Sequence, residues 1–165
     1  MHFCPLISGV RRYQMTISYR SADTSDAKAI SDLVGGLSHY FLDDRSSPAG
    51  RPFLASITPE AFAERISAPN YQYILAESRD GLCGVVAMRD DSHLYHLFVD
   101  AKFHNQGLAR ELWQRSKAGS VSSRFTVNSS LFAIPVYSRL GFALAGDVQT
   151  KDGVSFQPMV YAAST

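Results

Sequence analysis

The stretch HLYHLFVDAKFHNQGLARELW, residues 93–113, runs from a strand pattern directly into a helix pattern. Its first seven residues are mostly the aromatic and aliphatic types that favour strands. Helical spacing begins after Gly107, where apolar side chains return at Leu108, Ala109, Leu112 and Trp113. Gly119 is a typical residue for a helix end. We therefore predict a strand over residues 93–99, a turn, and a helix that stops at Gly119.

The turn between this strand and this helix is suited to hold a phosphate group. The first N–H groups of a helix have no intrahelical partner and carry a positive partial charge, so residues 104–109 would point several of them the same way. Gly107 and Ala109 keep the backbone approachable. A plain strand-to-helix connection is the alternative interpretation of this spacing. The sequence has neither the Gly-Lys-Ser/Thr of a triphosphate loop nor the first two glycines of a dinucleotide fingerprint, which excludes both motifs here.

The segment resembles the acyl-CoA pyrophosphate loop of the GNAT superfamily of N-acetyltransferases. That signature is Gln/Arg-x-x-Gly-x-Gly/Ala after a strand ending in a hydrophobic residue, any residue and Val. Here His104-x-x-Gly107-x-Ala109 follows the strand end Leu97-Phe98-Val99. His104 stands in place of the usual Gln or Arg, and Ala101 in place of a frequent Pro. The main-chain contacts that the resemblance implies depend on neither side chain.

A second stretch, VNSSLFAIPVYSRLGF at residues 127–142, resembles a later motif of the same superfamily. That motif carries Asn after a strand, then Ala, then Tyr-x-x-x-Gly-Phe. Two motifs in the family order are more specific than either alone. The resemblance implies acetyl-CoA as cosubstrate, no metal, and a set of cofactor-binding residues made of Leu97, Phe98, Val99, His104, Asn105, Gln106, Gly107, Leu108, Ala109, Arg110, Asn128 and Ser130. Asn128 could bond the pantetheine arm or cap the following helix, and Ser130 stands where many relatives have a second Asn.

For catalysis, the resemblance implies transfer of an acetyl group to a primary amine by direct attack in a ternary complex. A backbone N–H near Phe98 would face the thioester carbonyl, and Tyr137 matches the acid that protonates the departing thiolate. Many relatives use a strand Glu as base, but residues 93–99 contain no carboxylate. His93, His96 or a water is therefore the candidate base, with His93 slightly preferred. Each histidine could instead fill a half-buried sheet position.

Strand alternation separates these side chains, if the strand is regular. His93 then shares one face with Tyr95, Leu97 and Val99, while His96 shares the other with Leu94 and Phe98. The two histidines cannot both face one cleft in a regular strand. Pro135 belongs in the first turn of its helix, Gly141 at the helix end, and Phe142 in the core.

Composition limits the function classes. The chain has 165 residues, 45% of them hydrophobic, which suits one domain. A net charge of +1 with scattered basic residues argues against nucleic acid or an anionic membrane as partner. Cys4 and Cys83 form no disulfide or metal-ligand pattern. We expect a cytoplasmic enzyme whose acceptor is a small-molecule or peptide amine, and a homodimer is compatible with the sequence.

The rest of the chain alternates helix and strand signals. We predict helices over 23–37, 58–66 and 133–140, and a loop over 45–56. Further strands are predicted at 16–20, 71–78, 82–89, 125–128, 143–148 and 156–162. Residues 1–14 are expected to be a tail before a single N-acetyltransferase domain at 15–165, with Met1 or Met15 as the start. The fold class is α/β (α+β), a mixed and mostly antiparallel sheet of six to seven strands with helices on both faces, like a GNAT acyl-CoA N-acyltransferase.

Three further interpretations stay open at this point. The missing strand carboxylate and His104 would also suit a non-catalytic CoA-binding sensor or interaction module. A protein N-terminus or lysine could be the acceptor if the loop over 40–56 leaves an open groove. Asp43 and Asp44 could attract a cationic amine or could simply be solvated, and His39 and Tyr40 are expected to be packing residues.

Overall fold

The computed structural model describes residues 16–40, 42, 48–151 and 153–163 of the chain. The expected tail at 1–14, the alternative start Met15, and the residues Cys4, Asp43 and Asp44 lie outside the described residues. The expectations about them remain predictions.

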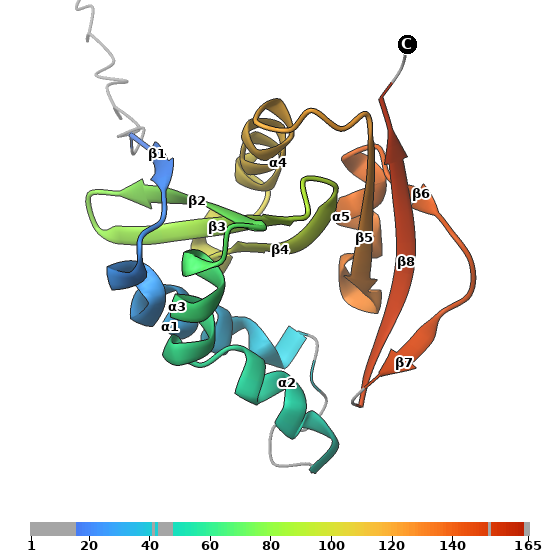
Figure 1. Ribbon diagram of the computed structural model, residues 1–165, viewed down its shortest axis with the longest axis horizontal. Coiled ribbons are helices and arrows are strands. Elements are labelled where there is room, and N and C mark those ends of the chain that lie inside the picture. The colour runs from blue at the N-terminus through green and yellow to red at the C-terminus, as the bar shows by residue number, and fades with distance from the viewer. Residues whose placement is uncertain (1–15, 41, 43–47, 152, 164–165) are drawn as a thin grey trace, which may run out of the picture.

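One mixed sheet organises the described part of the chain (Figure 1). Its order is β1-β2-β3-β4-β5-β8-β6, with β7 paired to β8. Every pairing is antiparallel except the parallel one between β4 and β5. The strands are β1 (Ser18–Ser21), β2 (Tyr71–Ser78), β3 (Gly81–Arg89), β4 (His93–Val99), β5 (Arg124–Ser130), β6 (Ala143–Leu144), β7 (Gln149–Lys151) and β8 (Val154–Ala162).

The described residues form eight strands where the sequence predicts six or seven. The strand predicted over 143–148 is wrong in its extent. Only Ala143–Leu144 of that range form a strand, β6, because the chain turns at Gly146, whose φ is +86°. The additional strand is β7, which begins after the predicted range, at Gln149. A positive φ does not occur in a regular strand. The predicted class of a mixed, mostly antiparallel sheet is confirmed.

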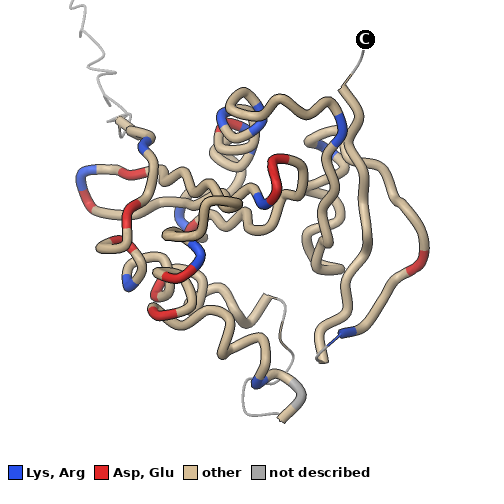
Figure 2. The backbone as a smooth tube through the Cα atoms, viewed as in Figure 1, with Lys and Arg blue, Asp and Glu red and all other residues tan. Residues whose placement is uncertain are grey.

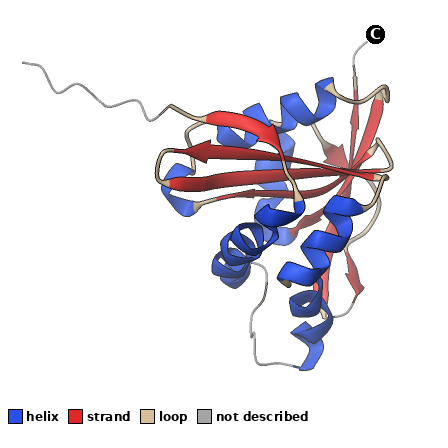
Figure 3. Cartoon of the chain, turned by 60° about the vertical axis from the view of Figure 1, so that its left-hand side comes forward, coloured by secondary structure: helices blue, strands red, loops and turns tan. Residues whose placement is uncertain are grey.

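Helices cover both faces of the sheet, as predicted (Figure 3). The core on one face contains Leu112 and Trp113 of α4 and Tyr137 of α5, and the core on the other contains Ile30 of α1 and Phe62 of α3. We call these the α4/α5 face and the α1/α3 face. The helices are α1 (Ala27–Leu37), α2 (Arg51–Ser56), α3 (Pro59–Ser67), α4 (Leu108–Ala118) and α5 (Ile134–Arg139).

Short 3-10 turns join several of these elements. They are η1 (Thr24–Asp26), η2 (Ser38–Tyr40), η3 (Pro48–Gly50), η4 (Ala101–Phe103) and η5 (Leu131–Ala133). The helix starts follow the sequence signals: Asp23 forms a capping box with Asp26, and the Thr58 hydroxyl accepts the N–H of Ala61. The predicted loop over 45–56 is wrong for its last six residues. They form α2, because a proline lies in the first turn and Phe53 and Leu54 pack on the α1/α3 core.

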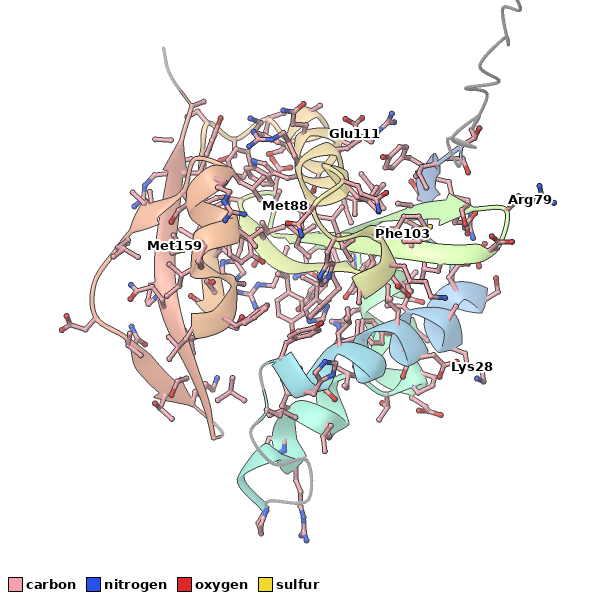
Figure 4. All side chains as sticks on the ribbon, turned by 180° about the vertical axis from the view of Figure 1, so that it is seen from behind. Lys28, Arg79, Met88, Phe103, Glu111 and Met159 are labelled. Carbon is pink, nitrogen blue, oxygen red and sulfur yellow. The ribbon has the colours of Figure 1, made fainter. Side chains whose placement is uncertain are left out.

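The interior is filled from both faces and the charges are spread over the outside. Figure 4 shows Met88 and Met159 inside the molecule, each about 1% exposed, while Lys28 and Arg79 point away from it. Figure 2 shows that basic and acidic residues are distributed over many elements, with neither sign gathered on one. In the described part of the chain no helix is long and apolar enough to cross a membrane, and no cluster of His, Cys, Asp and Glu could hold a metal.

Gly141 ends the segment that carries Tyr137, as predicted. Its φ is +104°, and a Cβ on it would lie 3.0 Å from the Tyr161 ring. The N–H of Phe142 then donates to the carbonyl of Tyr137 at 3.0 Å, and Phe142 is buried, 3% exposed. Only glycine satisfies both the backbone angle and the space at this position.

We predict that Gly141→Ala destabilises the protein by roughly 1–3 kcal/mol, because it adds backbone strain and a clash with Tyr161. The control is Gly36→Ala near the end of α1, where an added Cβ meets nothing within 4 Å. That change should be neutral or stabilising by up to about 1 kcal/mol. Urea unfolding of both variants measures the difference. Equal stability of the two variants would contradict the role given to Gly141.

Candidate active site

The turn after β4 has the backbone shape that the sequence predicts for a phosphate site. Asp100 begins it, with its carboxylate accepting the N–H of Lys102 at 2.9 Å. Asn105 and Gly107 have φ values of +61° and +80°, so the backbone reverses direction just before α4 begins at Leu108. Gly107 supplies the left-handed conformation without strain. Leu108 is buried and anchors the helix on the α4/α5 core.

The main-chain N–H groups of residues 105–110 form an open cradle. Within the described part of the chain none of them donates a hydrogen bond to another backbone group, whereas Glu111 N–H donates to the Gly107 carbonyl at 3.1 Å. Residues 104–107 are exposed. A hollow of about 300 Å³ adjoins this turn on the side of β1, with Gln106 and Gly107 in its lining. Successive unpaired N–H groups at a helix start make this cradle a site for an anion.

The polar side chains of the turn and of the first turn of α4 donate hydrogen bonds to main-chain carbonyls of the protein. His104 Nε2 donates to the carbonyl of Val99 at 2.8 Å, and Gln106 Nε2 donates to the carbonyl of Lys102 at 3.0 Å. Arg110 Nη2 donates to the carbonyl of Arg139 at 2.8 Å and so links α4 to the end of α5. These three predicted cofactor-binding side chains therefore fix the turn, and the cradle itself is made by the main chain.

The parallel pairing of β4 with β5 stops early. It consists of His93 opposite Thr126 and Leu94 opposite Val127, although β4 continues to Val99 and β5 to Ser130. In Figure 1, β2, β3 and β4 run across the view while β5 and β8 run nearly upright. The β5-facing main-chain groups of Leu97 are consequently not used in this ladder. The Val99 carbonyl accepts the hydrogen bond from His104 instead. This stretch of β4 therefore has main-chain groups that can bond an extended ligand.

A β-bulge at Tyr95 corrects the predicted alternation in β4. The register with β3 shifts between Ala87, opposite His96, and Met88, opposite Leu94. Because an extra residue reverses the facing of all that follow it, Leu97 packs with the α4/α5 core and Phe98 with the α1/α3 core, as Tyr95 does. His96 lies on the α1/α3 face too, its ring 5.7 Å from that of Phe62. The prediction put Leu97 and Val99 on the face of the sheet opposite Leu94. In the structure all three pack with the α4/α5 core, so this prediction is wrong.

The two histidines differ in their partners. His93 Nδ1 lies 2.7 Å from the hydroxyl of Thr126, and burial lowers the pKa of His93 to about 4, with a smaller effect of Arg89. His96 is 9% exposed, and burial with the nearby Arg65 charge lowers its pKa to about 3. Its Nδ1 has no hydrogen-bond partner among the described residues. Both imidazoles are thus neutral at pH 7.

Tyr137 lies on the opposite face of the sheet. It is 7% exposed in the α4/α5 core, to which Leu97 and Val99 also belong, and its ring packs edge-on to Phe142 at 5.7 Å. Burial raises the pKa of its hydroxyl well above the usual 10. Pro135 lies in the first turn of α5, as predicted. The phenol is therefore a neutral hydrogen-bond donor over the whole physiological range.

In the second motif the residue that caps the following helical turn differs from the predicted one. Asn128 lies in β5 with its side chain exposed. The capping role considered for it belongs to Ser130, whose hydroxyl accepts the N–H of Ala133 at 3.2 Å. Sequence reasoning chose Asn128 because it precedes the helical pattern, but β5 extends two residues further than expected.

Two residues that sequence reasoning did not place in the site, Tyr40 and Arg65, lie beside the predicted ones. Tyr40 stacks on Phe132 with ring centres 4.9 Å apart, and its ring is 6.0 Å from that of His104, so η2 contacts both motifs. Arg65 of α3 lies over the rings of Phe62 and Tyr95. The contacts of Tyr40 with Phe132 and of Arg65 with Tyr95 join chain segments that are distant in sequence, and no local pattern signals them.

The structure thus combines an anion cradle, an early end of the β4–β5 pairing and a buried phenol. A family model described as an acetyltransferase (GNAT) domain matches residues 38–163, most of the chain. The chain belongs to the GNAT family, and the protein is an acetyltransferase.

Solved structures share the fold at low sequence identity. A GCN5-related N-acetyltransferase of Rhodopseudomonas palustris has a TM-score of 0.72 at 15% identity, covering 90% of this chain and 97% of that one. The paia N-acetyltransferase of Thermoplasma acidophilum, solved in complex with coenzyme A, has a TM-score of 0.70 at 14% identity and coverages of 90% and 99%. Nourseothricin acetyltransferase reaches 0.61 at 18%, with coverages of 90% and 99%. No curated protein matches the chain.

The buried neutral His96 should make folding stability depend on pH. Its pKa is lower in the folded protein than the unfolded value of about 6.5, so the unfolded chain binds a proton first as pH falls, and stability is lost below about pH 6.5. We predict that His96→Leu reduces the loss in unfolding free energy between pH 7 and pH 5 by about 2 kcal/mol. Urea unfolding at both pH values measures it. An unchanged difference would show that His96 titrates normally in the folded state.

Proposed function

We propose that the protein transfers an acetyl group from acetyl-CoA to a primary amine by direct attack in a ternary complex. The observation that carries the proposal is the early end of the β4–β5 pairing beside the open N–H cradle. Together they would provide an extended strand edge for the cofactor arm, with the N–H cradle for its phosphates at the end of that edge. Tyr137 lies on the α4/α5 face of the sheet beside this edge, and His96 lies on the α1/α3 face.

The residues present are suited to acetyl-CoA. The N–H groups of residues 105–110 would hold the pyrophosphate, and the β5-facing main chain of β4 at Leu97 would bond the pantetheine arm. When bound, acetyl-CoA supplies an acetyl group activated as a thioester. A backbone N–H near Phe98 would stabilise negative charge on the acetyl oxygen, a contribution of about 2.7–4 kcal/mol for one such donor. Ser130 and Asn128 stay proposed contacts at the end of β5.

Tyr137 would act as the acid. A phenol of raised pKa does not give up its proton outright to an ordinary thiolate of pKa near ~8.5. Its hydroxyl instead donates a hydrogen bond to the sulfur as charge develops, and a thiolate in the same dry environment is itself more basic than in water. The α4/α5 core that surrounds Tyr137 excludes water from this hydrogen bond.

The proton of the acceptor amine leaves by way of water. Moving it from an ammonium of pKa ~10.4 to an imidazole of pKa about 3 is uphill by roughly 10 kcal/mol, which makes His96 a poor base. His93 is little better, since its pKa is lowered to about 4. The histidines are instead hydrogen-bonding groups that can orient the amine or a water on the α1/α3 face.

We therefore predict that kcat/KM rises with pH in proportion to the free amine, up to the pKa of the amine itself. The same rise is expected in His93→Gln and His96→Gln, because neither imidazole takes the proton. Initial rates between pH 6 and pH 10 measure the profile. An inflection between pH 6 and pH 7 that disappears in either variant would assign the proton to that histidine.

We predict that the wild-type protein binds acetyl-CoA and releases thiol only when an amine is present. Tyr137→Phe should bind acetyl-CoA within about threefold of wild type and lose at least tenfold in kcat, because only the hydroxyl is removed. Calorimetry measures binding, and thiol release with a panel of amines measures turnover.

The matched control is Tyr161→Phe. Tyr161 lies in contact with the same core, but its hydroxyl accepts a hydrogen bond from Lys117 Nζ at 2.8 Å, remote from the proposed chemistry. Turnover in this variant should be unchanged. Binding without any amine-dependent thiol release in the wild type would favour a non-catalytic CoA-binding module instead.

A further inference from the structure

Arg65 is held rigidly on the α1/α3 face. Its Nε donates to the Tyr73 hydroxyl at 3.0 Å and its Nη2 donates to the carbonyl of Ser56 at 2.6 Å. The guanidinium carbon lies 4.7 Å from the ring centre of Phe62 and 5.5 Å from that of Tyr95. These contacts from α3, β2 and β4 place a half-buried positive charge beside the bulge of β4.

This charge has no anionic partner in the described residues. Among the described residues no carboxylate lies within ion-pair distance of Arg65, whereas Arg20, Arg89 and Arg115 each reach one. A guanidinium has five N–H donors. Two are used by Tyr73 and Ser56, so three remain for a ligand. The aromatic faces offset only part of the cost of burying the charge, since each such contact contributes about 0.5–2 kcal/mol.

A second unsatisfied group lies against the same two aromatic rings. The His96 ring is 4.3 Å from that of Tyr95 and 5.7 Å from that of Phe62. More than nine-tenths of this residue is buried, and its Nδ1 has no hydrogen-bond partner among the described residues. A buried polar atom without a partner costs about 1–3 kcal/mol. Arg65 and His96 thus converge on one region with donors that a single anionic group could satisfy.

We propose that Arg65, assisted by His96, binds a carboxylate of the acceptor, so that the acceptor is an amino acid or a similar amine that bears a carboxylate. This inference rests on the proposed function. In the reaction the amine nitrogen forms a bond to the acetyl carbon as the carbon–sulfur bond breaks. The amine loses one proton, the sulfur gains one, and the carboxylate is unchanged. A planar guanidinium fork matches a carboxylate in two hydrogen bonds.

The position of Arg65 assigns the anion to the acceptor and not to the cofactor. Arg65 contacts Phe62 and Tyr73 of the α1/α3 core, whereas the phosphate cradle precedes α4, which packs on the other face. His96 and Phe98 connect the two locations along β4, with ring centres 5.2 Å apart. A polycationic amine would be repelled by Arg65.

The experiment compares amino acids with their own C-terminal amides as acceptors, together with a diamine, using saturating acetyl-CoA. Wild type should prefer each acid over its amide by at least tenfold in kcat/KM. Arg65→Gln should abolish this preference by slowing the reaction of the acid at least tenfold, while the reaction of the amide changes less than threefold. Arg65→Lys keeps the charge without the fork and should retain part of the preference, and it replaces Arg65→Gln if that variant does not fold.

The matched control is Arg89→Gln. Arg89 lies over the same Tyr95 ring at 5.3 Å, but its Nε is already 3.5 Å from the Asp90 carboxylate. This variant should keep the preference of wild type. Loss of the preference in Arg89→Gln but not in Arg65→Gln would overturn the assignment to Arg65.

Calorimetry on the protein loaded with coenzyme A separates this inference from the proposed function. Amino acids should bind wild type at least tenfold more tightly than their amides do, and Arg65→Gln should remove the difference. If they bind in this way but no amine is acetylated, the proposed function fails and the carboxylate site stands. If amides or the diamine equal the acids in binding and in rate, or Arg65→Gln keeps the preference, the carboxylate site is overturned while acetyl transfer stands.

Discussion

The site depends on one interruption of backbone pairing, the end of the β4–β5 ladder after two residue pairs. Unpaired main-chain groups in the interior of a sheet are costly, so such a gap persists only where the surrounding structure imposes it. Here the imposing features are the bulge at Tyr95 and the pairing of each strand with its other neighbour, β3 or β8. The cradle follows one of the two strands and the helix of Tyr137 follows the other. The interruption therefore sets the positions of the cradle and of Tyr137 relative to each other.

A second consequence is that the candidate site residues are divided between the two faces of the sheet. The cradle and Tyr137 belong to the α4/α5 face, while His96 and Arg65 belong to the α1/α3 face. With the bulge, β4 presents Leu97 to one face and Phe98 to the other. Under the proposed function, the acceptor and the cofactor would approach from opposite faces and meet at the open edge. Direct transfer without a covalent enzyme intermediate needs such an arrangement.

The sequence predicted the features that local chemistry determines. The strand, the glycine turn and the helix over residues 93–119 follow from residue type and spacing, and so do Pro135 and Gly141 around Tyr137. The bulge could not be predicted, because HLYHLFV is compatible with either alternation and only the register with β3 decides between them. The Ser130 cap followed from how far β5 extends. Arg65 depended on packing between three elements, which no spacing in the sequence encodes.

The internal bonding of the phosphate turn has a thermodynamic consequence for ligand capture. Within residues 99–107 the Asp100 carboxylate, the carbonyls of Val99 and Lys102, and the side chains of His104 and Gln106 already bond to one another or to the turn backbone. Ordering a backbone residue costs roughly 1–2 kcal/mol in conformational entropy. In this turn that entropy is lost on folding and not on ligand binding. An anion that binds to this turn would therefore meet a preorganised receptor, and little of its intrinsic affinity would be used to immobilise the chain.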